Sequence, residues 1–256
     1  IDKNHRNPTG KTGLALHYVE CHDNYTLFDK LVYQFDNTIK GDGDWAEKFA
    51  ALYQTVMSDS EKLSLVKKQE KLAAAYIILS QGTPFLNGGQ KFMRTKKGDP
   101  DSYAPDTKGG IKWTSRYNGG TYVAATDIDD VNTIDLSMKE TYKDVYNTYK
   151  GLIALRKSNA AFTNPTSCTA VKLQDGITRY TVSKDSETYE VYFNASDSDF
   201  KPVYVSGETL GAGIKNVKAE KGVWGKVVSV ENGNVSTADV ATLQPVEAHS
   251  FLIIKK

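Results

Sequence analysis

LALHYVECHDNYTLFDKL, residues 14–31, begins apolar, becomes polar at Glu20 and turns apolar again after Thr26. Residues 14–19 form a short, largely apolar run, which predicts a buried strand. The polar residues that follow would then lie at the carboxyl end of that strand, the edge at which active sites gather in α/β folds. The stretch therefore predicts an α/β architecture with a polar cluster where a strand leaves its sheet.

Three interpretations of this polar cluster are open. Side chains alternate along a strand, so one face would carry His17, Cys21 and Asp23, and the other would carry Glu20 and His22. Neither face gathers three good metal ligands, and the spacings H-E-x-x-H and C-x-x-C are missing, so metal binding is the weakest interpretation. Satisfied polar residues at a strand end and a catalytic cluster both remain. The place of the cluster after an inner strand modestly favours catalysis.

The rest of the chain divides into helical and strand-like parts. Apolar residues recur at helical spacing in 44–59, 61–82 and 139–159, which predicts three helices. Residues 83–90 predict a second short inner strand, and the polar stretch 91–139 predicts a functional loop because it is too long for an ordinary connection. Beyond residue 161, short alternating runs separated by turn-forming pairs such as Asp175-Gly176 predict an antiparallel β-sandwich. We place a domain boundary near residue 160.

Composition narrows the function classes. The 256 residues are 39% hydrophobic and 25% charged, which is typical of a globular protein with one large or two smaller domains. A net charge of +1 predicts neither a nucleic acid nor a membrane as partner. Cys21 and Cys168 lie far apart, so two free thiols are expected, with one disulfide as the alternative. The acids of GDGDW (41–45) and DIDD (127–130) are expected in solvated loops, with calcium binding as the alternative.

Three ordered motifs carry a resemblance to a known family. VECHDNYTLFDKL (19–31) resembles the fourth signature region of the α-amylase superfamily, the family 13 glycoside hydrolases, in the form found in type I pullulanases. LSQGTPFLNGGQKFMRTKKGDPDSYAPDTKGGIKW (79–113) looks like the eighth barrel strand and the loop after it, and YKGLIALRKSNAAF (149–162) resembles the final barrel helix. The resemblance is to the C-terminal portion of such an enzyme.

The resemblance implies a role for each matching residue. Asp23 would be the family's third carboxylate, which stabilises the transition state as the sugar ring becomes cationic, and His22 would donate hydrogen bonds to glucose hydroxyls. Asn24 would shape the same subsite, and Arg94 would lie near a neighbouring one. Tyr103 is a further substrate-binding candidate because its ring could stack on a sugar, the alternative being that it only packs its loop.

The resemblance also implies an architecture. Residues 1–160 would be the C-terminal part of a (β/α)8 TIM barrel, with its last two strands and helices, and residues 161–256 would be the β-sandwich. A complete barrel takes about 250 residues, and the family motifs that carry the nucleophile and the general acid do not occur in this sequence. We therefore expect the chain to begin just before the seventh strand and to be inactive alone. Its expected partner is the remaining N-terminal barrel portion, in the same or another chain.

The implied activity is hydrolysis of α-1,6-glucosidic linkages with retention, in α-glucans such as pullulan, starch, glycogen or limit dextrins. One alternative is another α-glucan hydrolase such as an α-amylase, and a second is a non-catalytic carbohydrate-binding module. No cofactor is implied with certainty, although calcium stays open. Because polymeric glucans are usually attacked outside the cell, an extracellular or cell-surface location is expected, with the cytoplasm as the alternative.

Overall fold

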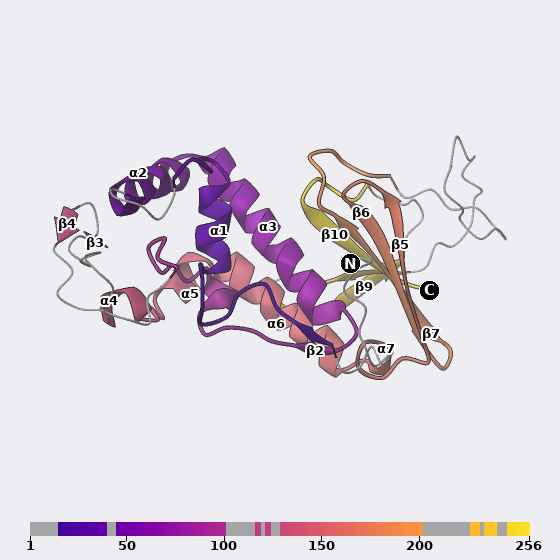
Figure 1. Cartoon of the computed structure of the whole chain (residues 1–256). Coiled ribbons are helices and arrows are strands. Elements are labelled where there is room, and N and C mark those ends of the chain that lie inside the picture. The colour runs from indigo at the N-terminus through magenta and orange to yellow at the C-terminus, as the bar shows by residue number, and fades with distance from the viewer. Residues whose placement is uncertain are drawn as a thin grey trace. The chain divides into compact units, whose positions relative to one another are not determined.

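The computed structural model describes residues 15–39, 45–100, 116–118, 121–123, 129–201, 226–230, 233–239 and 245–256. The chain divides into two compact units (Figure 1). The helical unit comprises the described residues of Leu16–Glu70 and Pro84–Tyr146. The sheet unit comprises those of Ile1–Ala15, Lys71–Thr83 and Asn147–Lys256. The domain boundary near residue 160 stays a prediction.

The first helices of the helical unit are three in number. α1 spans Leu27–Tyr33, α2 spans Trp45–Ser58, and α3, which spans Ser60–Leu79, starts in this unit. The predicted helices 44–59 and 61–82 are confirmed as α2 and α3. α1 was not predicted. Its signal is Thr26, whose side chain accepts a hydrogen bond from the backbone N–H of Asp29 and so caps the start of the helix.

Aromatic and aliphatic side chains form the core of the helical unit. The Phe28 ring is 1% exposed, and its centroid lies 5.9 Å from that of Tyr53 and 6.2 Å from that of Tyr142. Val56 and Val66 are fully buried at core-facing positions of α2 and α3. Burial of such rings supplies most of the free energy that holds short helices together, because isolated helices of this length are marginal in water.

The later elements of the helical unit are short. They are the 3-10 helix η2 (Gln90–Phe92), the antiparallel pair β3 (Arg116–Asn118) and β4 (Thr121–Val123), and the helices α4 (Asp129–Asn132) and α5 (Met138–Thr141). The prediction of one continuous helix over 139–159 is wrong at its start, because the backbone of Tyr142 (φ −112°, ψ 41°) separates α5 from α6 (Lys143–Lys157). Tyr142 is 2% exposed beside Phe28, so the break places a large ring in the core.

Two short strands, far apart in the chain, run side by side. β1 is Leu16–His17 and β2 is Thr83–Pro84. Thr83 N–H donates to Ala15 O (2.7 Å) and Phe85 N–H donates to His17 O (2.9 Å), so the two strands advance in the same direction. Both predicted strands are therefore present but shorter than expected.

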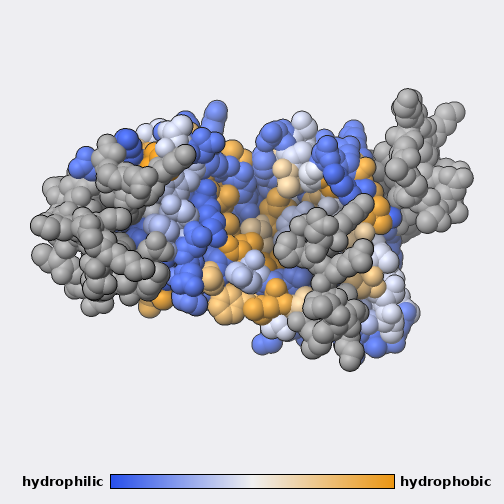
Figure 2. All heavy atoms as spheres, in the orientation of Figure 1, coloured by the Kyte–Doolittle hydropathy of each residue, from blue (hydrophilic) through white to orange (hydrophobic). Residues whose placement is uncertain are grey.

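The prediction that the first strand is buried is wrong for this chain. Leu16 is 57% exposed, Tyr18 55% and Phe85 39%. In the described residues β1 and β2 form a two-stranded sheet, so apolar side chains around them face solvent. Figure 2 shows hydrophobic side chains at the surface near the place where β2 lies in Figure 1.

The sheet unit contains one antiparallel sheet of six strands in the order β5-β6-β7-β10-β8-β9. The strands are β5 (Ser167–Gln174), β6 (Ile177–Lys184), β7 (Glu187–Asn194), β8 (Lys226–Ser229), β9 (Ser236–Asp239) and β10 (Ser250–Lys255). Alternating runs in the sequence predicted five of these strands, β5, β6, β7, β8 and β10, whereas β9 was not predicted. Gly176 makes the predicted β5–β6 turn with φ +75°. The described strands form a single layer, so the two-layered sandwich stays a prediction.

One face of the sheet packs on helices of the same unit. The Tyr76 ring of α3 stacks on Phe193 of β7 at 4.0 Å between centroids, and Phe162 of α7 (Ala160–Thr163) lies 5.0 Å from Tyr189. The Arg156 guanidinium donates to the carbonyls of Ile78 (2.7 Å), Ser80 (2.8 Å) and Gly82 (2.6 Å), at and just beyond the end of α3. Arg156 thereby satisfies carbonyl groups that a helix end leaves without intrahelical partners.

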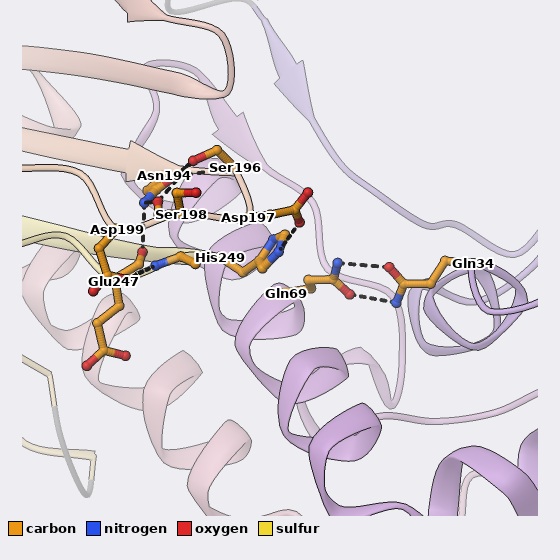
Figure 3. Close-up of polar contacts among 10 residues, drawn as sticks. Gln34, Gln69, Asn194, Ser196, Asp197, Ser198, Asp199, Glu247 and His249 are labelled. Carbon is orange, nitrogen blue, oxygen red and sulfur yellow. Dashed lines mark hydrogen bonds and ion pairs between the residues drawn. The ribbon is translucent and has the colours of Figure 1, made fainter.

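A buried amide joins two loops at one end of the sheet (Figure 3). Asn194 is fully buried, and its Nδ2 donates to the carbonyls of Ser198 (2.8 Å), Val246 (2.9 Å) and Glu247 (3.0 Å). Its Oδ1 accepts from the N–H (3.0 Å) and the hydroxyl (2.7 Å) of Ser196. Both ends of the amide are therefore satisfied, as a buried polar group requires.

None of the described helices is both long enough and apolar enough to cross a membrane.

Candidate active site

The residues expected to contact substrate form a bend after β1. His22 Nε2 lies 3.3 Å from Asp23 Oδ2, and the two side chains are 83% and 62% exposed. The strand alternation from which we predicted opposite faces does not reach them, because β1 ends at His17. The bend therefore presents imidazole and carboxylate together to solvent.

Asn24 completes this bend in an unusual backbone conformation. Its φ is +65°, in the left-handed region that asparagine tolerates better than most residues. Its Oδ1 accepts a hydrogen bond from Tyr25 N–H at 2.7 Å, and the residue is exposed to solvent. The structure thus brings together three predicted site residues, His22, Asp23 and Asn24, which we call the HDN loop.

Side chains from residues 87–96 hold the backbone of the HDN loop. Asn87 Nδ2 donates to the carbonyl of Cys21 at 3.2 Å. Lys96 Nζ donates to the carbonyls of Asn24 at 2.8 Å and His22 at 3.3 Å. Lys96 is only 2% exposed, so these loop carbonyls accept hydrogen bonds from a buried ammonium group.

Asp29 on α1 fixes the segment that carries Lys96. Its Oδ1 accepts from the Thr95 hydroxyl at 2.5 Å, and its Oδ2 accepts from Lys96 N–H at 2.8 Å. Asp29 is completely buried, and burial raises the pKa of its carboxyl group while these hydrogen bonds act to lower it. The Asp29 carboxyl group therefore holds the segment that carries Lys96 in place and does not face the solvent.

Glu20 is a second buried acid that the sequence did not single out for a role. It is 2% exposed, and its Oε2 accepts from the backbone N–H of Leu27 at the start of α1. Burial raises the pKa of the Glu20 carboxyl group, and the hydrogen bonds from Leu27 and Asn87 act in the opposite direction. Glu20 and Asp29 are both engaged with the fold, so Asp23 is the exposed carboxylate of this segment.

Arg94 lies in the same unit, but its guanidinium is engaged by the backbone. Nη2 donates to Asn132 O at 2.8 Å and Nη1 to Gly88 O at 3.4 Å. Gly89 has φ +91°, and a Cβ there would lie 2.6 Å from the Arg94 Cβ, so a larger residue at Gly89 would displace this side chain. Burial lowers the pKa of Arg94, while the negative charges of Glu20 and Asp29 raise it. Its sugar-binding role stays a prediction.

Two other expectations fall partly or wholly outside the described residues. Tyr103 lies outside them, as do most of the acids in 41–45 and 127–130. In the part of the chain that is described, no group of three His, Cys, Asp or Glu side chains could hold a metal ion. Cys21 and Cys168 are both free thiols, as expected. Calcium therefore stays open.

The chain is similar in sequence and in structure to known proteins. No protein-family model matches the chain. A curated *Bacillus subtilis* (strain 168) protein is 32% identical over 148 residues, which cover 58% of this chain and 14% of that protein. The solved structure of a *Bacillus acidopullulyticus* protein covers 94% of this chain and 24% of its own, with a TM-score of 0.59 and 23% identity. These relatives are pullulanases.

A third match extends the comparison. The type I pullulanase from *Bacillus subtilis* strain 168, solved in complex with maltose, has a TM-score of 0.59 and 20% identity, and covers 94% of this chain and 27% of its own. The resemblance to pullulanases seen in the sequence is confirmed. The chain spans about one seventh of the curated relative and about a quarter of the solved ones, so it is similar to a small part of a pullulanase.

Proposed function

We propose that the chain is the C-terminal part of a pullulanase-like debranching enzyme, which hydrolyses α-1,6-glucosidic linkages in α-glucans with retention. In this proposal residues 1–160 supply the last two strands and helices of a (β/α)8 barrel, and residues 161–256 supply a β-sandwich. The nucleophile and the general acid come from the preceding barrel portion. The chain alone would then be inactive.

The observation that carries the proposal is the exposed His22–Asp23 pair just beyond the carboxyl end of β1. β1 and β2 run in the same direction, as neighbouring strands of a parallel barrel must, and the catalytic groups of such barrels lie at the carboxyl ends of strands. The exposed apolar side chains of Leu16, Tyr18 and Phe85 support the proposal further, because additional barrel strands would cover them.

The chemistry of glycoside cleavage explains why these groups would face substrate. The transition state resembles an oxocarbenium ion, so a fixed carboxylate at Asp23 stabilises the positive charge that develops on the sugar ring. Hydrogen bonds from His22 to ring hydroxyls strengthen as that charge forms. Retention requires two further carboxyl groups, about 5–5.5 Å apart across the scissile bond, which the preceding barrel portion would supply.

The related structures favour an α-glucan as the ligand. The *Bacillus subtilis* pullulanase was solved with maltose bound, and we propose the same class of sugar for the HDN loop. An α-amylase-like enzyme would instead favour α-1,4 linkages. Assay of the longer polypeptide on pullulan and on unbranched amylose separates the two, because cleavage of amylose alone would contradict a debranching activity.

The decisive experiment is Asp23→Asn in the longer polypeptide that carries this segment. We expect turnover of pullulan to fall on the order of 10²- to 10³-fold, because a fixed charge that acts on the transition state is lost. Asp175→Asn is the matched control, since Asp175 is also exposed and also pairs with a close neighbour, Lys172. It should leave turnover unchanged.

Three outcomes would contradict the proposal. If Asp23→Asn retains full turnover, the HDN loop does not act on the reacting sugar. If the longer polypeptide binds glucans without any turnover, the chain belongs to a non-catalytic carbohydrate-binding protein. Robust hydrolysis of pullulan by residues 1–256 alone would show that the preceding portion is not required.

A further inference from the structure

Lys96 differs from an ordinary lysine in its burial and in what it contacts. Its side chain is 2% exposed, and Nζ reaches the carbonyls of His22 and Asn24, 74 and 72 residues away in sequence. An ammonium group loses favourable hydration when it is buried, so it stays charged only where other polar groups replace the water. Here backbone carbonyls of the HDN loop provide part of that replacement.

These contacts fix peptide groups on both sides of Asp23. The carbonyl of His22 belongs to the peptide that precedes Asp23, and the carbonyl of Asn24 belongs to the peptide that follows the Asp23–Asn24 pair. Asn87 adds a third contact on the carbonyl of Cys21. Three of the four peptides between Cys21 and Tyr25 are therefore oriented by side chains from residues 87–96.

The anchor of Lys96 is itself rigidly placed. Asp29 receives hydrogen bonds from the hydroxyl of Thr95 and the N–H of Lys96, and it lies on α1, whose start is capped by Thr26. α1 follows the HDN loop directly in the chain. The loop is thus held from both directions, by the helix that follows it and by the segment that contains Lys96.

We propose that Lys96 is a positioning residue, which orients the HDN loop so that Asp23 and His22 meet the reacting sugar, with Asn87 as its auxiliary. This inference rests on the proposed function. Asn24 adopts φ +65°, a conformation that a free loop would occupy only part of the time. By holding the carbonyls on either side, Lys96 keeps the loop in that conformation before substrate arrives, and preorganisation of this kind lowers the barrier of the chemical step.

The test is a double-mutant cycle in the longer polypeptide, with Lys96→Met and Asp23→Asn. Methionine has a similar length but cannot donate hydrogen bonds. We expect Lys96→Met to lower kcat on pullulan by about 10- to 100-fold when Asp23 is present, and by less than about 2-fold when Asp23 is already Asn. In the Asp23→Asn background the carboxylate that Lys96 orients is absent, so loss of Lys96 has little further effect on kcat. Equal losses in both backgrounds would overturn the inference, because a purely structural defect is independent of Asp23.

Hydrogen exchange supplies a readout that does not depend on turnover. We expect the amides of residues 21–25 to exchange about 10-fold faster in Lys96→Met, while exchange elsewhere in the helical unit is unchanged. Lys30→Met is the matched control, because exposed Lys30 also donates to a backbone carbonyl, that of Val19 at 2.9 Å, but contacts a residue before the HDN loop. Unchanged exchange at residues 21–25 in Lys96→Met would overturn the inference.

Asn87→Ala covers the case in which Lys96→Met fails to fold. It removes one carbonyl contact and should show the same coupling to Asp23 and the same local exchange, both to a smaller extent. Absence of both effects would overturn the inference. Failure of the proposed function is recognised separately, because in that case Asp23→Asn alone leaves turnover intact.

Discussion

Among the residues that the structure describes, two His–Asp pairs lie in very different settings. In the helical unit, His22 and Asp23 are neighbours in the chain, 3.3 Å apart, with both side chains largely exposed. In the sheet unit, His249 Nε2 lies 2.9 Å from Asp197 Oδ1, and the histidine side chain is only 14% exposed (Figure 3). The first pair is presented to solvent, whereas the second joins two loops. A His–Asp pair therefore does not identify a site by itself, and its exposure and backbone support decide what it can do.

The two pairs also differ in the buried group that supports them. Asn194 holds the two loops at the end of the sheet with a neutral amide. Its Nδ2 donates to backbone carbonyls and its Oδ1 accepts from Ser196, so the amide needs no charged partner. Lys96 holds the HDN loop with a charged group that can only donate. The buried acids Glu20 and Asp29 lie just before that loop and on α1. Charged support costs more in stability. Such support is expected where orientation matters more than stability.

The largest expected effect on stability is at the neutral support. Asn194→Ala should lower the free energy of unfolding by about 3 kcal/mol, because three carbonyls and the Ser196 hydroxyl lose the same buried partner at once. Urea unfolding monitored by circular dichroism measures this, with exposed Asn164→Ala as the matched control. A loss no greater than that of the control would show that the loops do not depend on this amide.

The contrast between the pairs can be tested on activity. His22→Ala in the longer polypeptide should lower kcat/KM on pullulan by about 100-fold, roughly 2.7 kcal/mol, because hydrogen bonds to the transition state are lost. His249→Ala removes the other pair and should leave kcat/KM within about 2-fold. Comparable losses from the two substitutions would end the distinction between a pair whose histidine is exposed and a pair whose histidine is largely covered.

A smaller effect follows from the buried acid beside the HDN loop. Because burial raises the pKa of Glu20 in the folded chain above its ordinary value of 4.5, its contribution to stability is complete below pH 4.5. That contribution is lost as the pH rises through the folded-state pKa, at up to about 1.4 kcal/mol per pH unit. Glu20→Gln keeps an acceptor for Leu27 N–H and cannot titrate.

Urea unfolding between pH 4 and pH 7 tests this difference. The stability of Glu20→Gln relative to the unsubstituted chain should rise as the pH increases above 4.5. Exposed Glu61→Gln is the matched control and should follow the unsubstituted chain. Parallel curves for Glu20→Gln and the unsubstituted chain would show that burial of this carboxyl group carries no cost.

Local patterns predicted much of the fold. Helical periodicity located α2 and α3, and alternation with turn-forming pairs located β5, β6, β7, β8 and β10. These features depend on residues close in the chain, so their signal is visible without tertiary contacts. The break at Tyr142 was missed because the burial of that ring beside Phe28, across 114 residues, is not visible in a local pattern. α1 could have been found from Thr26 and Asp29, spaced as an N-cap pair.

The candidate site was predicted in part. His22, Asp23 and Asn24 were recognised as a motif, and the structure brings them together in one bend. Glu20 was seen only as part of the polar cluster, and Asn87 and Lys96 were not singled out for a role. Lys96 looks like a surface residue within KFMRTKKGD, since lysine is rarely buried. Only its contacts with residues far away in sequence show otherwise.

The amino-acid sequence by itself determined the local elements, the chemical groups at the end of the first strand and the resemblance to pullulanases. These follow from spacing and residue type along the chain. The tertiary structure alone decided which acid is exposed, which acids are buried, and which lysine supports the loop. Those properties arise from contacts between segments some 70 residues apart. Burial shifts the pKa of a charged side chain, and a local stretch of sequence does not show which charged residues are buried.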